Sequence, residues 1–336
     1  MRIIKLPFVP GLQVDFADRD PALRRIVEWA ERGTRFVKVI YGPEGCGKTA
    51  WLKQSIEILR ELNFNVIYVN PIEETFLAEV NIPSIKRDFT NLVREAISQS
   101  AVGRIVWNVI NLAREAISAG SGRLAIIIDD AFQVIGVRES AIYVKGLLGV
   151  IEYPSASYDR IVAIVATSEG LSRVEIGRHL WAEILPIWNM PKNGFEKLYS
   201  QIPGGKLSLE DAWMLTGGNP RMLALLYENN WSIEGTVNEL IKFKDIDQGF
   251  VKRWRNQLEK AVEDPDYLWF EAPRELVNKL IAKNLIIYNM YDRDLQFWID
   301  EPPPIRDPEL GIGKYVAWQT PLHREAVKRA LENLGS

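Results

Sequence analysis

Cysteine and histidine are scarce in this sequence of 336 residues, which contains one cysteine and two histidines. A single cysteine excludes an internal disulfide, and together with two histidines it is too little for a structural Cys/His zinc site. No apolar run approaches the roughly 18–20 residues that a membrane-spanning helix requires. Residues 1–7 contain a proline and charges where a signal peptide has a long apolar stretch, so we expect a cytoplasmic protein without membrane partners.

The sequence also lacks an excess of charge of either sign. Its formal net charge is −3, with 47% apolar and 25% charged residues, which is close to the average for soluble globular proteins. This balance excludes a disordered chain, a collagen-like fibre and a strongly basic nucleic-acid binder. At about 150 residues per domain, the length predicts about two domains.

Short apolar runs alternate with helical patterns over the first 190 or so residues. Four runs rich in β-branched or aromatic residues are predicted to be strands, and they lie at residues 36–41, 65–71, 124–128 and 161–166. The last two are apolar without alternation, as in a parallel sheet covered by helices. A fifth run at residues 182–187 contains Pro186, which would confine it to the edge of a sheet. A long helical stretch is expected from about Ile85 to Ala119. The fold class is therefore α/β, with a doubly wound parallel sheet.

A phosphate-binding loop follows the first of these strands. Residues 42–49 read GPEGCGKT and match the pattern G-x-x-x-x-G-K-[ST] at every constrained position, between a strand and a helix. The glycines let backbone N–H groups point inward, and the helix N-terminus adds partial positive charge. Lys48 is expected to reach the β- and γ-phosphates, and the Thr49 hydroxyl to bind Mg²⁺. The predicted nucleotide-binding segment is Gly42, Pro43, Glu44, Gly45, Cys46, Gly47, Lys48, Thr49 and Ala50.

Acidic and hydroxyl side chains end two of the other buried strands. Asp129 follows Ile126-Ile127-Ile128 and is the predicted Mg²⁺ residue, while Asp130 is the candidate to orient or deprotonate the attacking water. A helix cap or a solvent-facing acid is the alternative for Asp130. If the sheet follows the strand order usual for P-loop ATPases, the strand that ends in Thr167 and Ser168 lies between the Asp129 strand and the P-loop strand. There these hydroxyls could sense the γ-phosphate, with helix capping as the alternative.

Strand signals disappear at about Lys192 and helical periodicity takes over. After Asp245 we expect a helix over residues 274–284, then a hairpin of residues 285–290 and 295–299 around a polar turn. A last helix is predicted to begin with Thr320 as N-cap and Pro321 at its first position. Helices followed by a hairpin are typical of a winged-helix module.

These motifs together resemble the STAND branch of AAA+-type ATPases, most closely the archaeal ATPase family. The resemblance rests on residues 42–49, on residues 126–130, and on Gly218-Asn219-Pro220, which is similar to the lid motif of that family. It implies a P-loop domain at residues 1–191, a helical lid at 192–244 and a winged helix at 245–336. It also implies ATP or ADP with Mg²⁺ as cofactors.

The resemblance assigns roles to several further residues. Pro220 would pack near the adenine, and Arg221 would sense the γ-phosphate unless it is a surface residue. Phe16 and Arg19 would line the adenine pocket. Glu169 stands where many STAND proteins carry an arginine.

Arg173 and Arg178 lie where AAA+ proteins often place an arginine finger, a solvated surface position being the alternative for each. The oligomeric state stays open.

Several functions fit this sequence. The first is an ATP-binding switch with slow Mg²⁺-dependent ATPase activity, in which lid closure reports the nucleotide to the winged helix. The second is a non-catalytic scaffold that holds ADP until a partner binds. The third is a DNA-associated ATPase, although residues 246–336 carry 13 Lys and Arg against 15 Asp and Glu, whereas DNA-binding domains are normally basic on one face. A P-loop small-molecule kinase fits least, because no acceptor motif is present.

Overall fold

The computed structural model describes residues 2–80, 82–83, 85–90, 102–168 and 170–334. The chain forms two compact units. The first unit contains residues Met1–Ile3, Asp20–Tyr41 and Lys48–Leu185, and the second contains Ile4–Arg19, Gly42–Gly47 and Pro186–Ser336. The predicted division into three domains stays a prediction.

A sheet of six strands forms the centre of the first unit as far as it is described, in the order β5-β4-β6-β7-β3-β8. The strands are β3 (Val37–Tyr41), β4 (Asn65–Asn70), β5 (Thr75–Glu79), β6 (Arg123–Asp129), β7 (Arg160–Thr167) and β8 (Ala182–Pro186). The predicted position of β7 between β6 and β3 is confirmed, as is the edge position of β8, the strand that contains Pro186. The α/β class is confirmed too, but β5 pairs antiparallel with β4 and was not predicted.

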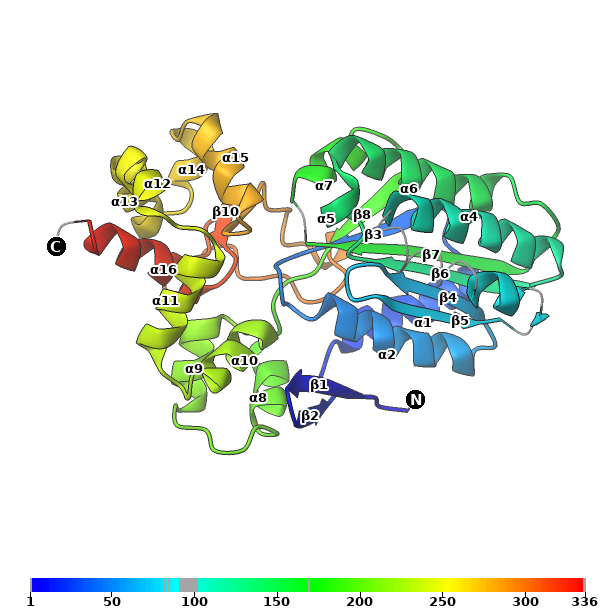
Figure 1. The fold of residues 1–336 in the computed structure, drawn as a ribbon, viewed down its shortest axis with the longest axis horizontal. Coiled ribbons are helices and arrows are strands. Elements are labelled where there is room, and N and C mark those ends of the chain that lie inside the picture. Colours follow the sequence, from blue (N-terminus) through cyan, green and yellow to red (C-terminus); the bar gives the residue numbers. More distant parts are fainter. Residues whose placement is uncertain (1, 81, 84, 91–101, 169, 335–336) are drawn as a thin grey trace. The chain divides into compact units, whose positions relative to one another are not determined.

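Helices cover both faces of this sheet (Figure 1). They are α1 (Asp20–Arg32), α2 (Lys48–Glu61), α4 (Val102–Ser118), α5 (Phe132–Ile135), α6 (Val137–Glu152) and α7 (Gly170–Ile176). Helices α1 and α2 pack together on one face, while α4 and α6 pack together on the other. Of the long helix predicted from about Ile85 to Ala119, residues 85–90 are helical and α4 begins at Val102, but residues 91–101 lie outside the described part.

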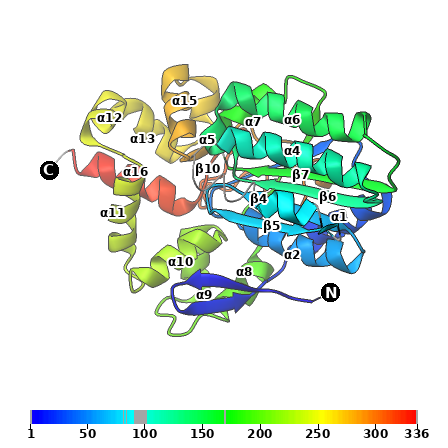
Figure 2. The same cartoon turned by 45° about the vertical axis from the view of Figure 1, so that its right-hand side comes forward.

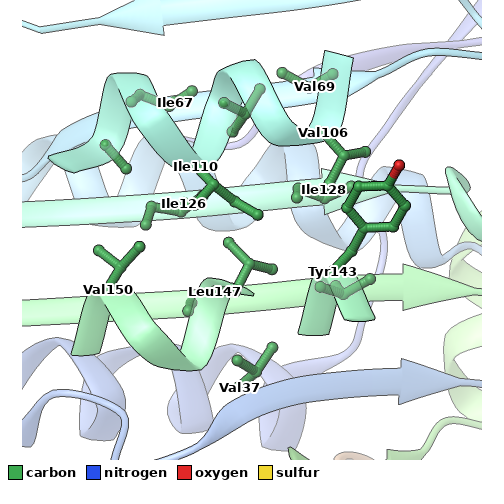
Figure 3. Close-up of a cluster of buried hydrophobic side chains, with 14 of the residues drawn as sticks. Val37, Ile67, Val69, Val106, Ile110, Ile126, Ile128, Tyr143, Leu147 and Val150 are labelled. Carbon is green, nitrogen blue, oxygen red and sulfur yellow. The ribbon is translucent and has the colours of Figure 1, made fainter. Parts of the chain in front are cut away.

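The main core of the first unit lies between the sheet and the α4–α6 face. Figure 3 shows Val106 and Ile110 of α4 and Leu147 and Val150 of α6 pointing toward sheet side chains such as Ile126. All five residues are at most 1% exposed. Burial of this kind contributes about 1.5–3 kcal/mol for each large side chain. It holds the carboxyl ends of β3, β6 and β7 in fixed positions, where the predicted site residues lie.

The second unit contains a hairpin and two sets of helices. The hairpin consists of β1 (Lys5–Val9) and β2 (Leu12–Asp15) and turns at Gly11, whose φ of 83° favours glycine. The first set of helices is α8 (Lys192–Tyr199), α9 (Leu209–Thr216), α10 (Pro220–Glu228) and α11 (Ile233–Phe243). Asn219 is the N-cap of α10, and its side chain accepts hydrogen bonds from the N–H groups of Arg221 and Met222. Asparagine before a proline at the first helical position favours such a cap.

The second set of helices surrounds α16. Its elements are α12 (Gln248–Arg253), α13 (Arg255–Glu263), α14 (Tyr267–Phe270), α15 (Arg274–Ala282), β9 (Ile286–Tyr288), the 3₁₀ helix η1 (Leu295–Phe297), β10 (Val316–Trp318) and α16 (Pro321–Glu332). Helix α16 packs against α11, α12 and α13, as Figure 2 shows. The predicted cap is confirmed, because Thr320 Oγ1 accepts a hydrogen bond from the N–H of His323.

The predicted hairpin of residues 285–290 and 295–299 is wrong. Strand β9 pairs antiparallel with β10, and Leu295–Phe297 form η1 instead. The carboxylate of Asp266 accepts hydrogen bonds from the N–H groups of Lys314, Tyr315 and Val316 at 2.8–3.0 Å. These contacts position β10 from a residue almost fifty positions away, so no local pattern could reveal the pairing.

Candidate functional site

The P-loop connects β3 to α2 and has the backbone that its glycines predict. Gly45 and Gly47 have φ angles of 74° and 99°, which residues other than glycine rarely adopt. A Cβ atom on Gly42 would lie 2.0 Å from the carbonyl oxygen of Ile187, and one on Gly45 would lie 2.2 Å from Cβ of Arg221. Close packing therefore requires glycine at Gly42, and close packing together with conformation requires it at Gly45.

Lys48 and Thr49 begin α2, so they stand at the positive end of a helix dipole. The Lys48 side chain is buried, with 4% exposed. A buried ammonium group at a helix N-terminus is unfavourable unless anions are near. Within the first unit, the acidic end of β6 supplies such an anion, because Asp129 interacts electrostatically with Lys48.

Asp129 is the last residue of β6 and is completely buried. Its Oδ2 atom accepts hydrogen bonds from the Tyr68 hydroxyl at 3.0 Å and from Asn70 Nδ2 at 3.3 Å. Its Oδ1 atom is buried and has no hydrogen-bond partner among the described residues. Burial, together with the nearby Asp130, raises the pKa of the Asp129 carboxyl to about 6, while the Thr49 hydroxyl opposes this rise.

These groups fit a magnesium ion. Mg²⁺ binds oxygen atoms, and in nucleotide sites it takes one or two protein ligands together with phosphates and water. A buried carboxylate oxygen without a partner, with the Thr49 hydroxyl nearby, matches that requirement. No group of three or more His, Cys, Asp or Glu residues that could hold a metal ion occurs among the described residues.

Asp130 adopts a left-handed backbone conformation with φ of 51°. Such strain is tolerated best by Asn and Asp and is frequent at functional sites. The Asp130 N–H donates to the carbonyl oxygen of Ala166 at 3.0 Å, and Ser168 Oγ donates to Asp130 Oδ1 at 3.4 Å. These two hydrogen bonds hold Asp130 at the end of β7. Thr167, the last residue of β7, is fully buried.

The two arginines that follow β7 differ in their surroundings. Arg173 is buried, and its guanidinium carbon lies 4.9 Å from the centre of the Tyr41 ring, at the end of β3. The solvated alternative is therefore wrong for Arg173. Arg178 is exposed and pairs with Glu175 at 2.9 Å, as a surface arginine does. Glu169 lies outside the described residues.

Arg19 belongs to the second unit and is buried, with 2% exposed. Its guanidinium forms an ion pair of 2.7 Å with the buried Asp300. It also donates to the carbonyl oxygens of Cys46 and Trp188. These protein partners occupy Arg19, so its role toward adenine stays a prediction, as does that of the half-buried Phe16.

The first half of the P-loop, Gly42–Gly47, belongs to the second unit and is held there by other residues of that unit. Asn219 Nδ2 donates to the carbonyl oxygen of Glu44 at 2.9 Å, and the Glu44 N–H donates to Gln319 Oε1 at 2.8 Å. Lys244 pairs with the Glu44 carboxylate at 2.5 Å. The Arg221 N–H donates to the carbonyl oxygen of Gly45 at 3.3 Å, while its side chain is exposed. Pro220 begins α10 directly before it.

Sequence reasoning missed Tyr68, Asn70 and Gln319. Tyr68 and Asn70 had a detectable signal, because they are polar residues two positions apart in a buried strand and therefore share one face. Gln319 had none, because its partner Glu44 is 275 residues away in the chain.

Comparisons with solved structures find weak likenesses. A DNA replication initiation factor is 15% identical, with a TM-score of 0.34 over 75% of this chain and 70% of its own. AMPPCP-bound DnaA from Aquifex aeolicus is 15% identical, with a TM-score of 0.36 over 78% and 75%. The Aeropyrum pernix ORC1 protein in complex with DNA is 14% identical, with a TM-score of 0.37 over 97% and 94%. At these TM-scores the likenesses carry no argument about function.

A search of curated proteins finds no match. None of the described helices has the length and apolar character needed to cross a membrane. A family model described as an ATPase domain predominantly from Archaea matches residues 16–226, which is more than half of the chain. The matched segment contains the P-loop, the Asp129 strand end and the N-cap of α10. The chain therefore belongs to this archaeal family of P-loop ATPase domains.

Proposed function

We propose that the protein is a Mg²⁺-dependent ATPase that acts as a nucleotide-controlled switch. The observation that carries this proposal is the buried Oδ1 atom of Asp129, which receives no hydrogen bond from the residues that the structure describes and belongs to the same unit as Lys48 and Thr49. A buried carboxylate oxygen without a hydrogen bond is unfavourable in a purely structural site. A bound cation would compensate it.

Each residue of the site has a separate role in this mechanism. The amides of Gly45, Gly47 and Lys48 bind the phosphates, and the Lys48 ammonium neutralises their charge. Thr49 and Asp129 would hold Mg²⁺, which supplies charge stabilisation for the phosphoryl group when bound. Asp130 orients the attacking water, and its contact with Ser168 limits how it can move.

The switch follows from how the P-loop is held within the second unit. Asn219, Gln319 and Arg19 all bind backbone atoms of the segment Gly42–Gly47. We propose that phosphate binding shifts these backbone groups and so changes the hydrogen bonds from the lid (residues 192–244) and the winged-helix region (residues 245–336). Pro220 and Arg221 would then close over the nucleotide.

Two other functions are separated by experiment. A scaffold that holds ADP would release ADP when the purified protein is extracted with acid, and it would show no steady turnover. Binding to duplex DNA has less support, because Arg253, Arg255 and Lys279 on α12, α13 and α15 pair with neighbouring acids. A salt-dependent shift with duplex DNA, together with stimulated ATPase activity, would favour it.

The decisive test measures ATP hydrolysis in two site variants and in a control variant on the same helix as Lys48. Lys48→Ala and Asp129→Ala are each expected to abolish phosphate release from ATP with Mg²⁺. Lys53→Ala is the control, because Lys53 lies on α2 but forms only a partly exposed pair with Glu73. Undiminished hydrolysis in both site variants would refute the proposed function.

A further inference from the structure

Strand β4 lies beside β6 in parallel register and carries two polar side chains within a buried strand. Tyr68 lies opposite Ile127, which is two residues before Asp129 at the end of β6. Asn70 is the last residue of β4. Because side chains alternate along a strand, Tyr68 and Asn70 share one face, on which both reach Asp129. Tyr68 lies outside the segments on which the family resemblance rests, residues 42–49, 126–130 and 218–220.

The two side chains donate hydrogen bonds to the same oxygen of the carboxylate. The Tyr68 hydroxyl and Asn70 Nδ2 donate to Oδ2 of Asp129, at 3.0 and 3.3 Å. Oδ1 receives no hydrogen bond among the described residues. Two donors on Oδ2 fix the rotation of the carboxylate and direct Oδ1 away from β4.

The Tyr68 hydroxyl is well suited to this task. Tyr68 is 1% exposed, so its hydroxyl cannot rotate freely into water. A tyrosine phenol has an ordinary pKa of about 10, so at neutral pH it stays protonated and can donate. Asn70 is fixed as well, because its Oδ1 accepts hydrogen bonds from the N–H groups of Ile72 and Glu73.

We propose that Tyr68 is a positioning residue of the nucleotide site, which orients Asp129 so that its Oδ1 atom can take a divalent cation. The inference rests on the proposed function, since it assumes that Asp129 is the cation-binding carboxylate. Residues that orient a metal ligand change metal affinity by about 10–100-fold when they are replaced. Tyr68 acts through Asp129 and does not itself contact the cation.

The test replaces the hydroxyl alone and measures cation binding directly. Mn²⁺ is titrated into the full chain with a non-hydrolysable ATP analogue and followed by electron paramagnetic resonance. Tyr68→Phe should weaken Mn²⁺ binding about 10–100-fold and leave binding of the analogue in EDTA unchanged. Tyr158→Phe is the matched control, because its hydroxyl donates to the carbonyl oxygen of Ile151 in the same unit, and it should bind Mn²⁺ normally.

A double-mutant cycle separates positioning from a general structural effect. In the Asp129→Asn background, Tyr68→Phe should cause no further loss of Mn²⁺ affinity if it acts only through Asp129. Equal affinity of Tyr68→Phe and Tyr158→Phe would overturn the inference while leaving the proposed function intact. Normal Mn²⁺ affinity in Asp129→Asn itself would overturn the proposed function.

A second variant covers the case in which Tyr68→Phe does not fold. Asn70→Ser keeps an oxygen for the turn amides but removes the Nδ2 donor to Asp129. We expect a smaller loss of Mn²⁺ affinity than for Tyr68→Phe, because the Asn70 hydrogen bond is longer. Unchanged affinity in Asn70→Ser, with Tyr68→Phe unfolded, would also count against the inference.

Discussion

Replacing Arg19 with methionine should destabilise the second unit by about 3–5 kcal/mol, the usual effect of removing one partner from a buried ion pair. Arg19 and Asp300 are each 2% exposed, and their charged atoms are 2.7 Å apart. Methionine keeps the length and the Cβ atom of the side chain, so the left-handed backbone at Arg19, with φ of 69°, is equally strained in both proteins. The change therefore isolates the loss of the guanidinium.

The magnitude has two parts. Two unit charges about 4 Å apart attract by about 4 kcal/mol at an effective dielectric constant of ~20. Asp300 Oδ1 already lacks a hydrogen bond in the described structure, so loss of Arg19 leaves a buried carboxylate almost without compensation. The carbonyl oxygens of Cys46 and Trp188 lose a donor as well. For a domain of ~150–250 residues, about 3–5 kcal/mol lowers the melting temperature by about 10 °C.

Calorimetry and urea unfolding of the full chain measure the effect. Lys192→Met is the control, because Lys192 pairs with Glu210 at the surface of the same unit and should contribute less than about 1 kcal/mol. Adding Asp300→Asn to Arg19→Met should restore part of the stability, since it removes the unpaired charge. If Arg19→Met and Lys192→Met unfold at the same urea concentration, the reasoning is refuted.

The pH dependence of stability and the P-loop glycines provide two further tests. Burial lowers the pKa of His323 to about 3. Below pH ~6.5 this histidine is therefore protonated in the unfolded chain but not in the folded chain, and the free energy of unfolding decreases as the pH is lowered, by about 2 kcal/mol at pH 5. His323→Gln should reduce the difference between urea midpoints at pH 7 and pH 5, and an unchanged difference would contradict this. Gly45→Ala should lower the melting temperature and nucleotide affinity more than Gly204→Ala, which has φ of 68° but no atom within 4 Å of the added Cβ. Equal effects would show that conformation alone requires glycine at Gly45.

Local physical rules already determined much of this protein. The GPEGCGKT loop, the acidic end of the Asp129 strand and the caps at Asn219 and Thr320 each depend on a few neighbouring residues. Strands that are apolar on both faces require a covered parallel sheet, which predicts the fold class. The position of β7 between β6 and β3 was predicted from the usual strand order of P-loop ATPases. Pro186 lacks an N–H group and therefore predicts an edge strand.

Only the tertiary structure decided the contacts that join distant parts of the chain. The pairing of β9 with β10 depends on Asp266, and the surroundings of the P-loop depend on Arg19 and Gln319, whose partners are far away in sequence. In the sequence these residues cannot be distinguished from other polar residues, because only folding brings their partners within hydrogen-bond distance. Tyr68 is intermediate, because periodicity places it on one face of β4, but only the pairing of β4 with β6 brings its hydroxyl to Asp129. Periodicity is a property of neighbouring residues, whereas a hydrogen bond between distant residues exists only in the folded chain.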